Sequence, residues 1–240
     1  TGAYGLSVIT ALTAQNTVGV DAIYPVAIDF LKQQMQTVAR DIHIDAVKIG
    51  MLGTPEVTEA VATFVAGLDC PLVIDPVMVA KSGDRLLHAD AIASLRDLLI
   101  PKATLMTPNL PEAADLLGLA EADDREAMQV QASALLQLGS RAVLLKGGHL
   151  STEDSPDLLV FDHQSTWFDN ERIQTTNTHG TGCTLSSALA SYLGQGFSIP
   201  DAVLGAKTYI SGAIAASDQL NVGHGHGPVH HFWDLWRNND

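Results

Sequence analysis

Residues 177–184 read Asn-Thr-His-Gly-Thr-Gly-Cys-Thr and are followed by an apolar, small-residue run over 185–193. Gly180 and Gly182 permit a tight turn that exposes consecutive backbone N–H groups, and the run after them has helical character. The pattern therefore predicts a loop that opens into the N-terminus of a helix, which is a site for anions such as phosphate. Cys183 falls in the first turn of that helix, where a base could act. The alternative is a tight turn before a core helix with a buried cysteine.

Strands and helices alternate on both sides of this loop. The hydrophobic periodicity predicts strands over 7–13, 46–51, 72–74, 103–106 and 142–145, helices over 29–42, 54–67, 90–99, 110–118, 125–138 and 198–217, and a β-hairpin over 158–161 and 166–168. Thr54 before Pro55 and Ser198 before Pro200 are typical helix starts. The alternation favours an α/β fold, a three-layer αβα sandwich with a central, mostly parallel sheet.

Composition limits the class of protein. The 240 residues are 46% hydrophobic and 17% charged, which suits one domain spanning 1–240. The formal net charge of −14 argues against nucleic acid and anionic membranes as partners, because both would be repelled. Cys70 and Cys183 are far apart in unlike contexts, so a disulfide framework is not expected, and a reducing cytoplasm fits best. A phosphate site in so acidic a protein needs local cations.

Polar residues follow the expected strands or begin the helices after them. They are Gln15, Asp75, Asn109, Glu112, Lys146 and Cys183. Because the carboxyl ends of parallel strands meet at one edge of a sheet, we expect these side chains to gather there. Each has a plain alternative: Asp75 could cap a turn, Asn109 could form an Asx-turn, and Glu112 could simply favour the first helical turn. Together they describe a site for Mg²⁺ and a nucleotide.

Four motifs occur in an order that resembles one family over nearly the whole chain. They are Asp75-Pro76-Val77-Met78 with Lys81-Ser82-Gly83, Thr107-Pro108-Asn109-Leu110-Pro111-Glu112, Leu145-Lys146-Gly147-Gly148-His149, and residues 177–184. The set is similar to that of the hydroxymethylpyrimidine/phosphomethylpyrimidine kinases of thiamine biosynthesis, in the ribokinase superfamily. The resemblance implies ATP-dependent phosphorylation of 4-amino-5-hydroxymethyl-2-methylpyrimidine and then of its monophosphate, with Mg²⁺. It also implies a homodimer.

The resemblance carries roles for individual residues. It implies that Cys183 is the catalytic base where most of the superfamily has Asp. The resemblance also implies that Gly180, Thr181 and Gly182 form the catalytic loop and that Gln15, Met51 and Val77 bind the pyrimidine. It implies that Lys146 and Thr178 bind the nucleotide and that Asp75, Asn109 and Glu112 bind Mg²⁺. Core packing is the plain alternative for Met51. The histidines at 149, 179, 224 and 226 stand in glycine-rich spacing without rigid ligand geometry, so we do not expect a zinc site.

The N-terminus departs from the family pattern. The family begins with a strand and a glycine-rich stretch containing an Asp, and no residues here match them. We therefore expect an N-terminally incomplete chain whose sheet lacks its first strand.

Two other functions are consistent with the same fold. One is a pyridoxal kinase of the same superfamily, whose substrate also carries a hydroxymethyl group on a nitrogen heteroaromatic ring; Gln15 favours the pyrimidine. The other is a catalytically silent nucleotide-binding regulatory protein. The complete set of Asp75, Asn109, Glu112, Lys146 and Cys183 argues against a silent protein.

Overall fold

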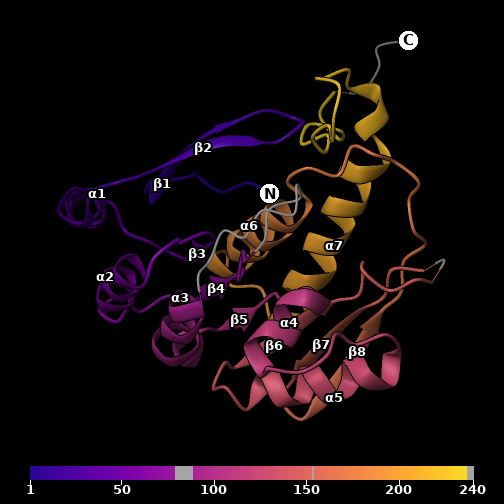
Figure 1. Ribbon diagram of the computed structural model, residues 1–240, viewed down its shortest axis with the longest axis horizontal. Coiled ribbons are helices and arrows are strands. Elements are labelled where there is room, and N and C mark those ends of the chain that lie inside the picture. Colours follow the sequence, from indigo (N-terminus) through magenta and orange to yellow (C-terminus); the bar gives the residue numbers. More distant parts are fainter. Residues whose placement is uncertain (79–88, 153, 237–240) are drawn as a thin grey trace.

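A six-stranded sheet forms the centre of the computed structural model, which describes residues 1–78, 89–152 and 154–236 (Figure 1). The strands lie in the order β3-β4-β5-β6-β7-β8. β3 to β6 are parallel to one another, and β7 is antiparallel to both of its neighbours, β6 and β8. Their bounds are β3 (Val47–Ile49), β4 (Leu72–Ile74), β5 (Leu105–Met106), β6 (Ala142–Lys146), β7 (Asp157–Phe161) and β8 (Gln164–Phe168). The mostly parallel central sheet is confirmed. The motif residues Lys81, Ser82 and Gly83 lie outside the described residues.

Helices connect the strands and follow the predicted starts closely. Thr54 accepts a hydrogen bond from the Val57 amide and Ser198 from the Asp201 amide, so both are N-caps. The bounds are α1 (Ile28–Asp41), α2 (Pro55–Val65), α3 (Ala89–Ser94), a π-helical turn η1 (Leu95–Leu99), a 3₁₀ turn η2 (Ile100–Lys102), α4 (Leu110–Leu117), α5 (Arg125–Leu136), α6 (Thr181–Gly194), α7 (Ile199–Ala215) and η3 (Ser217–Gln219). No helix in the described ranges is long and apolar enough to cross a membrane.

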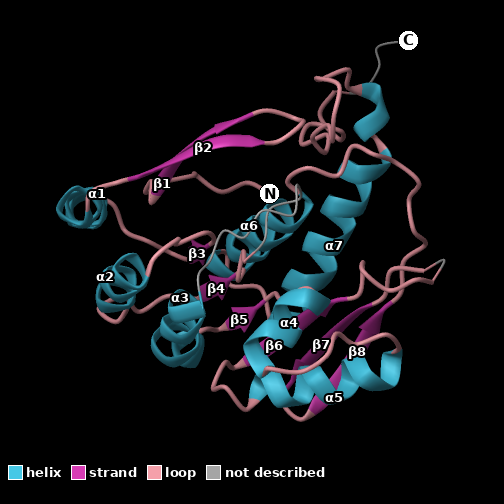
Figure 2. Cartoon of the chain, in the orientation of Figure 1, coloured by secondary structure: helices cyan, strands magenta, loops and turns pink. Residues whose placement is uncertain are grey.

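Successive residues of each central strand point into two separate hydrophobic cores. Leu72 and Ile74 pack with residues of α1 to α5, whereas Val73 between them packs with α6 and α7. Strands buried on both faces read as continuous apolar runs, as 72–74 and 142–145 do. Figure 2 shows the resulting three layers, with α6 and α7 on one side of the sheet and α2 to α5 on the other. The predicted αβα sandwich is confirmed.

A strand overlaps the predicted range 7–13, but its expected place in the central sheet was wrong. Residues 11–15 form β1 (Ala11–Gln15), which pairs with β2 (Val20–Pro25) in a separate antiparallel hairpin, and the pattern had not indicated β2. The turn between them reverses the chain, because the Asn16 amide donates to the Gly19 carbonyl and Asn16 Oδ1 accepts from the Val18 amide. Gln15 is therefore exposed on this hairpin and does not lie at the carboxyl edge of the parallel sheet.

Candidate active site

Asp75 follows β4 and stands at the centre of a buried polar cluster. The residue is 2% exposed. Oδ1 accepts hydrogen bonds from Lys146 Nζ at 3.0 Å and Thr107 Oγ1 at 3.2 Å, and Oδ2 accepts one from Ser186 Oγ at 3.1 Å. Lys48 Nζ lies 3.9 Å from Oδ2. Burial raises the pKa of Asp75, but Lys146 and Lys48 more than offset it, so this pKa falls below its usual range.

Lys146 ends β6 and lies between two carboxyl groups. Its Nζ is 3.0 Å from Asp75 Oδ1 and 4.0 Å from Glu112 Oε2. The Lys146 amide donates to the Pro108 carbonyl, which places Lys146 beside Asn109. Burial lowers the pKa of Lys146, but Asp75 and Glu112 outweigh it and raise the pKa above its ordinary value. The ammonium group is therefore a fixed cation at this edge of the sheet.

Asn109 and Glu112 form a reciprocal capping box at the start of α4. Asn109 Oδ1 accepts from the Glu112 amide and Glu112 Oε2 accepts from the Asn109 amide, both at 2.8 Å. The sequence allowed these two residues a structural role at the helix start as an alternative to binding Mg²⁺, and the structure shows that they have this role. Glu112 is 6% exposed, and burial raises its pKa to about 7 despite the opposing effect of Lys146. Its carboxyl group is consequently poised to titrate near neutral pH.

Glu112→Gln should change how the stability of the protein depends on pH. The folded state holds the Glu112 proton more tightly than the unfolded chain, because burial raises the pKa from 4.5 to about 7. The stability that this proton contributes is complete below pH 4.5 and is lost as the pH rises through 7. Gln keeps an oxygen for the cap but does not titrate. Denaturant unfolding in EDTA measures the free energy of unfolding of both proteins. Between pH 4.5 and 7, the value for the variant should rise by about 3 kcal/mol relative to that of the wild type. A difference that does not change with pH would contradict this prediction.

The glycine-rich loop meets this cluster through the N-terminus of α6. Gly180, with a φ of 83°, precedes the helix, and the Thr181 hydroxyl donates to the Thr178 carbonyl at 2.7 Å. A Cβ atom added at Gly182 would lie 3.4 Å from Lys146 Nζ. One turn later, Ser186 reaches Asp75. The first turn of α6 therefore lies directly against the lysine and the aspartate.

Cys183 is exposed in the first turn of α6, so the alternative of a buried core cysteine is wrong. Met51 and Val77 are partly buried in the loops that follow β3 and β4. The hairpin that carries Gln15 is tied to one of these loops, because Thr10 Oγ1 donates to the Met51 carbonyl at 2.9 Å. The structure thus brings Asp75, Asn109, Glu112 and Lys146 together with the first turn of α6. Gln15 lies on a separate hairpin.

Sequence reasoning missed three residues that contact Asp75. Lys48 lies inside the predicted strand over 46–51, and its position on β3, next to β4, was the available signal. Ser186 stands four residues after Gly182, on the same face of the helix. Thr107 begins a recognised motif, but nothing in the sequence indicated that its hydroxyl would bond to a residue 32 positions earlier.

A buried lysine and two carboxyl groups adjoin a glycine-preceded helix N-terminus at the carboxyl edge of an αβα sandwich. This combination suits an enzyme that transfers phosphoryl groups. The family model for phosphomethylpyrimidine kinase matches residues 1–230. The chain belongs to the phosphomethylpyrimidine kinase family.

Known relatives agree with this assignment. The chain is 50% identical over 236 residues to the hydroxymethylpyrimidine/phosphomethylpyrimidine kinase of Escherichia coli, covering 98% of this chain and 89% of that one. A crystal structure of phosphomethylpyrimidine kinase from Clostridium difficile is 42% identical, with a TM-score of 0.78 over 89% of this chain and 87% of that chain. An ADP complex of Bacillus subtilis pyridoxal kinase is 32% identical, with a TM-score of 0.89 over 98% of this chain and 88% of that chain.

Proposed function

We propose that this protein transfers the terminal phosphoryl group of ATP to the hydroxymethyl group of the pyrimidine alcohol, and then to its monophosphate, in thiamine biosynthesis. The observation that carries the proposal is the approach of Gly182 to Lys146 and Asp75. It joins the N–H donors of a helix start to a fixed cation, which is what a phosphoryl group in transfer requires. Membership in the family supports the choice of substrate.

The glycine-rich loop and Lys146 would bind the phosphates. Gly180 caps α6, and Thr181 and Gly182 are its first two residues. Their backbone N–H groups therefore lie at the helix N-terminus, where the helix dipole favours negative charge. Lys146 would offset the charge of the phosphates in a protein of net charge −14, and Thr178 would contact the nucleotide beside the loop. The ADP bound to the related pyridoxal kinase supports ATP as the co-substrate.

Cys183 would act as the general base. Its exposed thiolate would take the proton from the substrate hydroxyl while the hydroxyl oxygen attacks the terminal phosphorus, and ADP would leave. Cys183 is the third residue of α6, so its side chain would lie beside the backbone N–H groups that bind the phosphates.

Asn109, Glu112 and Asp75 fit a hydrated Mg²⁺ better than a directly bound one. The caps of Asn109 and Glu112 occupy one lone pair on each, and hydrogen bonds occupy both oxygens of Asp75. Within the described ranges, no three carboxyl, histidine or cysteine groups gather to hold a metal directly. Mg²⁺ usually keeps several bound waters in proteins, and the oxygens of these residues could accept hydrogen bonds from those waters. Bound there, the ion would offset charge that develops on the phosphates.

The pyrimidine would lie between the sheet edge and the hairpin, in contact with Met51, Val77 and Gln15. The hydrogen bond from Thr10 to the Met51 carbonyl supports this, since it ties the base of the hairpin to the loop after β3. The Gln15 amide can both donate to and accept from an aminopyrimidine edge.

Gln15→Leu should weaken the pyrimidine selectively. Loss of both hydrogen-bonding functions leaves buried polar groups of the ring unpaired, at about 1–3 kcal/mol each. Steady-state kinetics should show a higher KM for the pyrimidine alcohol and an unchanged KM for ATP. Gln36→Leu, on an exposed position of α1, is the matched control. If both KM values rose equally in the Gln15 variant, Gln15 would not belong to the substrate site.

An ADP-release assay with the pyrimidine alcohol, its monophosphate and pyridoxal tests the proposal. We expect turnover of the two pyrimidines and a higher kcat/KM for them than for pyridoxal. The fold similarity to a pyridoxal kinase makes pyridoxal phosphorylation the second candidate function. A preference for pyridoxal would replace the first proposal with the second, and ATP turnover with neither alcohol would overturn both.

We also propose that the protein is a cytoplasmic homodimer, in which a second copy covers the β1–β2 hairpin. Leu12 and Tyr24 are directly opposite on one face and Ile23 lies on the other, and their exposed fractions are 55%, 71% and 48%. An isolated two-stranded hairpin is at best marginally stable in water, so apolar residues on both faces need a cover. Both cysteines are free, which supports a reducing compartment.

Light scattering after gel filtration tests the dimer. Tyr24→Lys should yield monomer, because a charge would be buried in the interface. Val130→Lys, which changes an apolar residue 62% exposed on α5, should remain dimeric. A wild-type monomer at micromolar concentration would rule out the proposal.

A further inference from the structure

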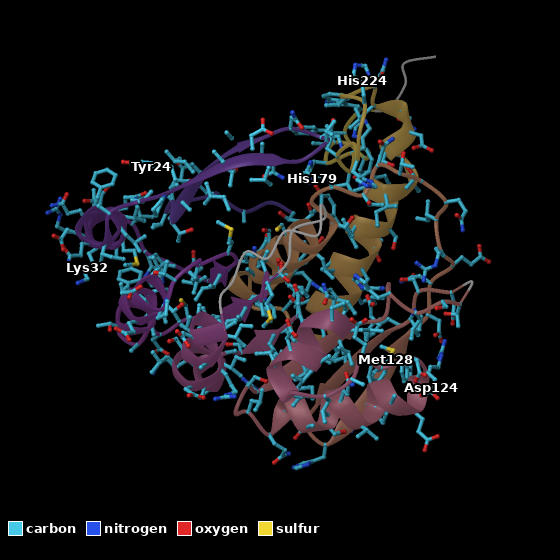
Figure 3. The ribbon with its side chains drawn as sticks, viewed as in Figure 1. Tyr24, Lys32, Asp124, Met128, His179 and His224 are labelled. Atoms are coloured by element: carbon cyan, nitrogen blue, oxygen red, sulfur yellow. The ribbon has the colours of Figure 1, made fainter. Side chains whose placement is uncertain are left out.

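Residues 223–227 read Gly-His-Gly-His-Gly, and none of them has a part in the proposed chemistry. This segment, called here the glycine–histidine strap, follows α7 and η3 and lies against the tip of the β1–β2 hairpin (Figure 1). Figure 3 shows His224 of the strap above His179 of the glycine-rich loop. We propose that the strap is a positioning element that fixes the hairpin tip and the glycine-rich loop relative to each other. The inference rests on the proposed function.

The strap binds the hairpin tip through Thr17. The Gly225 amide donates to Thr17 Oγ1 at 3.2 Å, and the His226 amide donates to the Thr17 carbonyl at 2.8 Å. A Cβ atom added at Gly225 would lie 2.1 Å from the Thr17 carbonyl oxygen. At Gly223, with a φ of 70°, it would lie 2.2 Å from Thr17 Oγ1. No larger residue fits at either position while these contacts are kept.

The other end of the strap binds the glycine-rich loop. The His179 amide donates to the Gly227 carbonyl at 3.0 Å, and the Val229 amide returns a bond to the His179 carbonyl at 3.2 Å. A Cβ atom at Gly227 would lie 2.2 Å from Asn177 Oδ1. Asn177 cannot easily yield, because its Nδ2 donates to Asp218 Oδ1 at 2.9 Å. His226 Nδ1 also lies 3.2 Å from the Thr176 carbonyl oxygen.

These contacts join the two halves of the proposed site. Thr17 stands two residues after Gln15, and His179 stands immediately before Gly180. The hairpin base is held at Met51 and its tip at the strap, so the strap sets how the Gln15 strand lies relative to the phosphate loop. Misplacing reacting groups by about 1 Å is enough to reduce rates by up to about 10²-fold.

Two alanine variants separate the two ends of the strap. Gly225→Ala should release the hairpin, raise the KM for the pyrimidine alcohol about tenfold and leave the KM for ATP unchanged. Gly227→Ala should push Asn177 and the loop, and lower kcat about tenfold. Adding Asn177→Ala should partly restore kcat in the Gly227 variant, since it removes the clashing atoms. Gly19→Ala is the control, because a Cβ there meets nothing within 4 Å.

Amide hydrogen exchange gives a readout independent of activity. In Gly225→Ala, residues 11–25 should exchange faster while 176–184 keep the wild-type rate. Thr17→Ala, which removes one acceptor without a clash, should shift exchange and KM in the same direction by a smaller factor.

Parallel changes in both KM values, or unchanged hairpin exchange in Gly225→Ala, would overturn the inference. An inactive wild-type protein would instead refute the proposed function, because the exchange experiment tests the strap without turnover.

Discussion

Cys183→Ala should lower kcat by about 10² to 10⁴, the usual contribution of a positioned general base. The reason is that alanine cannot accept the proton of the substrate hydroxyl. Nucleotide binding should persist, because the backbone N–H groups of the loop and the Lys146 side chain are unchanged. Single-turnover phosphoryl transfer and titration with ADP measure the two quantities separately.

Two further variants sharpen this test. Cys183→Asp should keep part of the activity, because a carboxylate can also accept the proton at this exposed position. Cys70→Ala changes the other free cysteine, outside the site, and should behave as the wild type. An alanine variant at position 183 with near-normal kcat between about pH 6 and 9 would remove the thiol from the mechanism.

Lys146→Met should destabilise the protein by about 3–5 kcal/mol at neutral pH, in addition to abolishing phosphate binding. The substitution leaves the buried Asp75 carboxylate without its 3.0 Å partner, and Lys48 at 3.9 Å compensates only in part. In the wild type the lysines hold the pKa of Asp75 low, so Asp75 contributes stability above its unfolded pKa and loses it as the pH falls. The difference between variant and wild type should therefore narrow below about pH 4.

Chemical denaturation of the double variant identifies the cause. Asp75→Asn combined with Lys146→Met should cost less than the sum of the single changes, because no unpaired charge remains buried. Lys32→Met, on the exposed face of α1, should leave stability unchanged (Figure 3). Strict additivity in the double variant would show that the two groups do not interact.

The α/β class was predictable because it depends on local patterns. Apolar runs such as 72–74 and caps such as Thr54 and Ser198 act within a few residues, and the structure confirms each of them. The same holds for the gathering of Asp75, Asn109, Glu112 and Lys146, because parallel strands deliver their carboxyl ends to one edge.

The pairing of β1 with β2 could not be predicted from local patterns. An apolar, β-branched run indicates a strand but not its partner. The run over 7–13 therefore gave no sign that β1 would pair with β2 or that the central sheet would begin at β3. The position of Gln15 followed from that pairing. Strand partners are chosen by long-range contacts, and those depend on the whole fold.

Outside the β1–β2 hairpin, the local sequence thus determined the elements, their caps and the chemical types of the site residues. Only the tertiary structure decided their electrostatics and alignment. Glu112 titrates near 7 because the packing of α4 buries it, and Asp75 stays ionised because residues 48 and 146 converge on it. The glycines of 223–227 likewise have a structural reason only in the folded protein, where Thr17 and Asn177 lie against them. Burial and close approach are properties of segments distant in the chain, and neither is encoded in any single stretch.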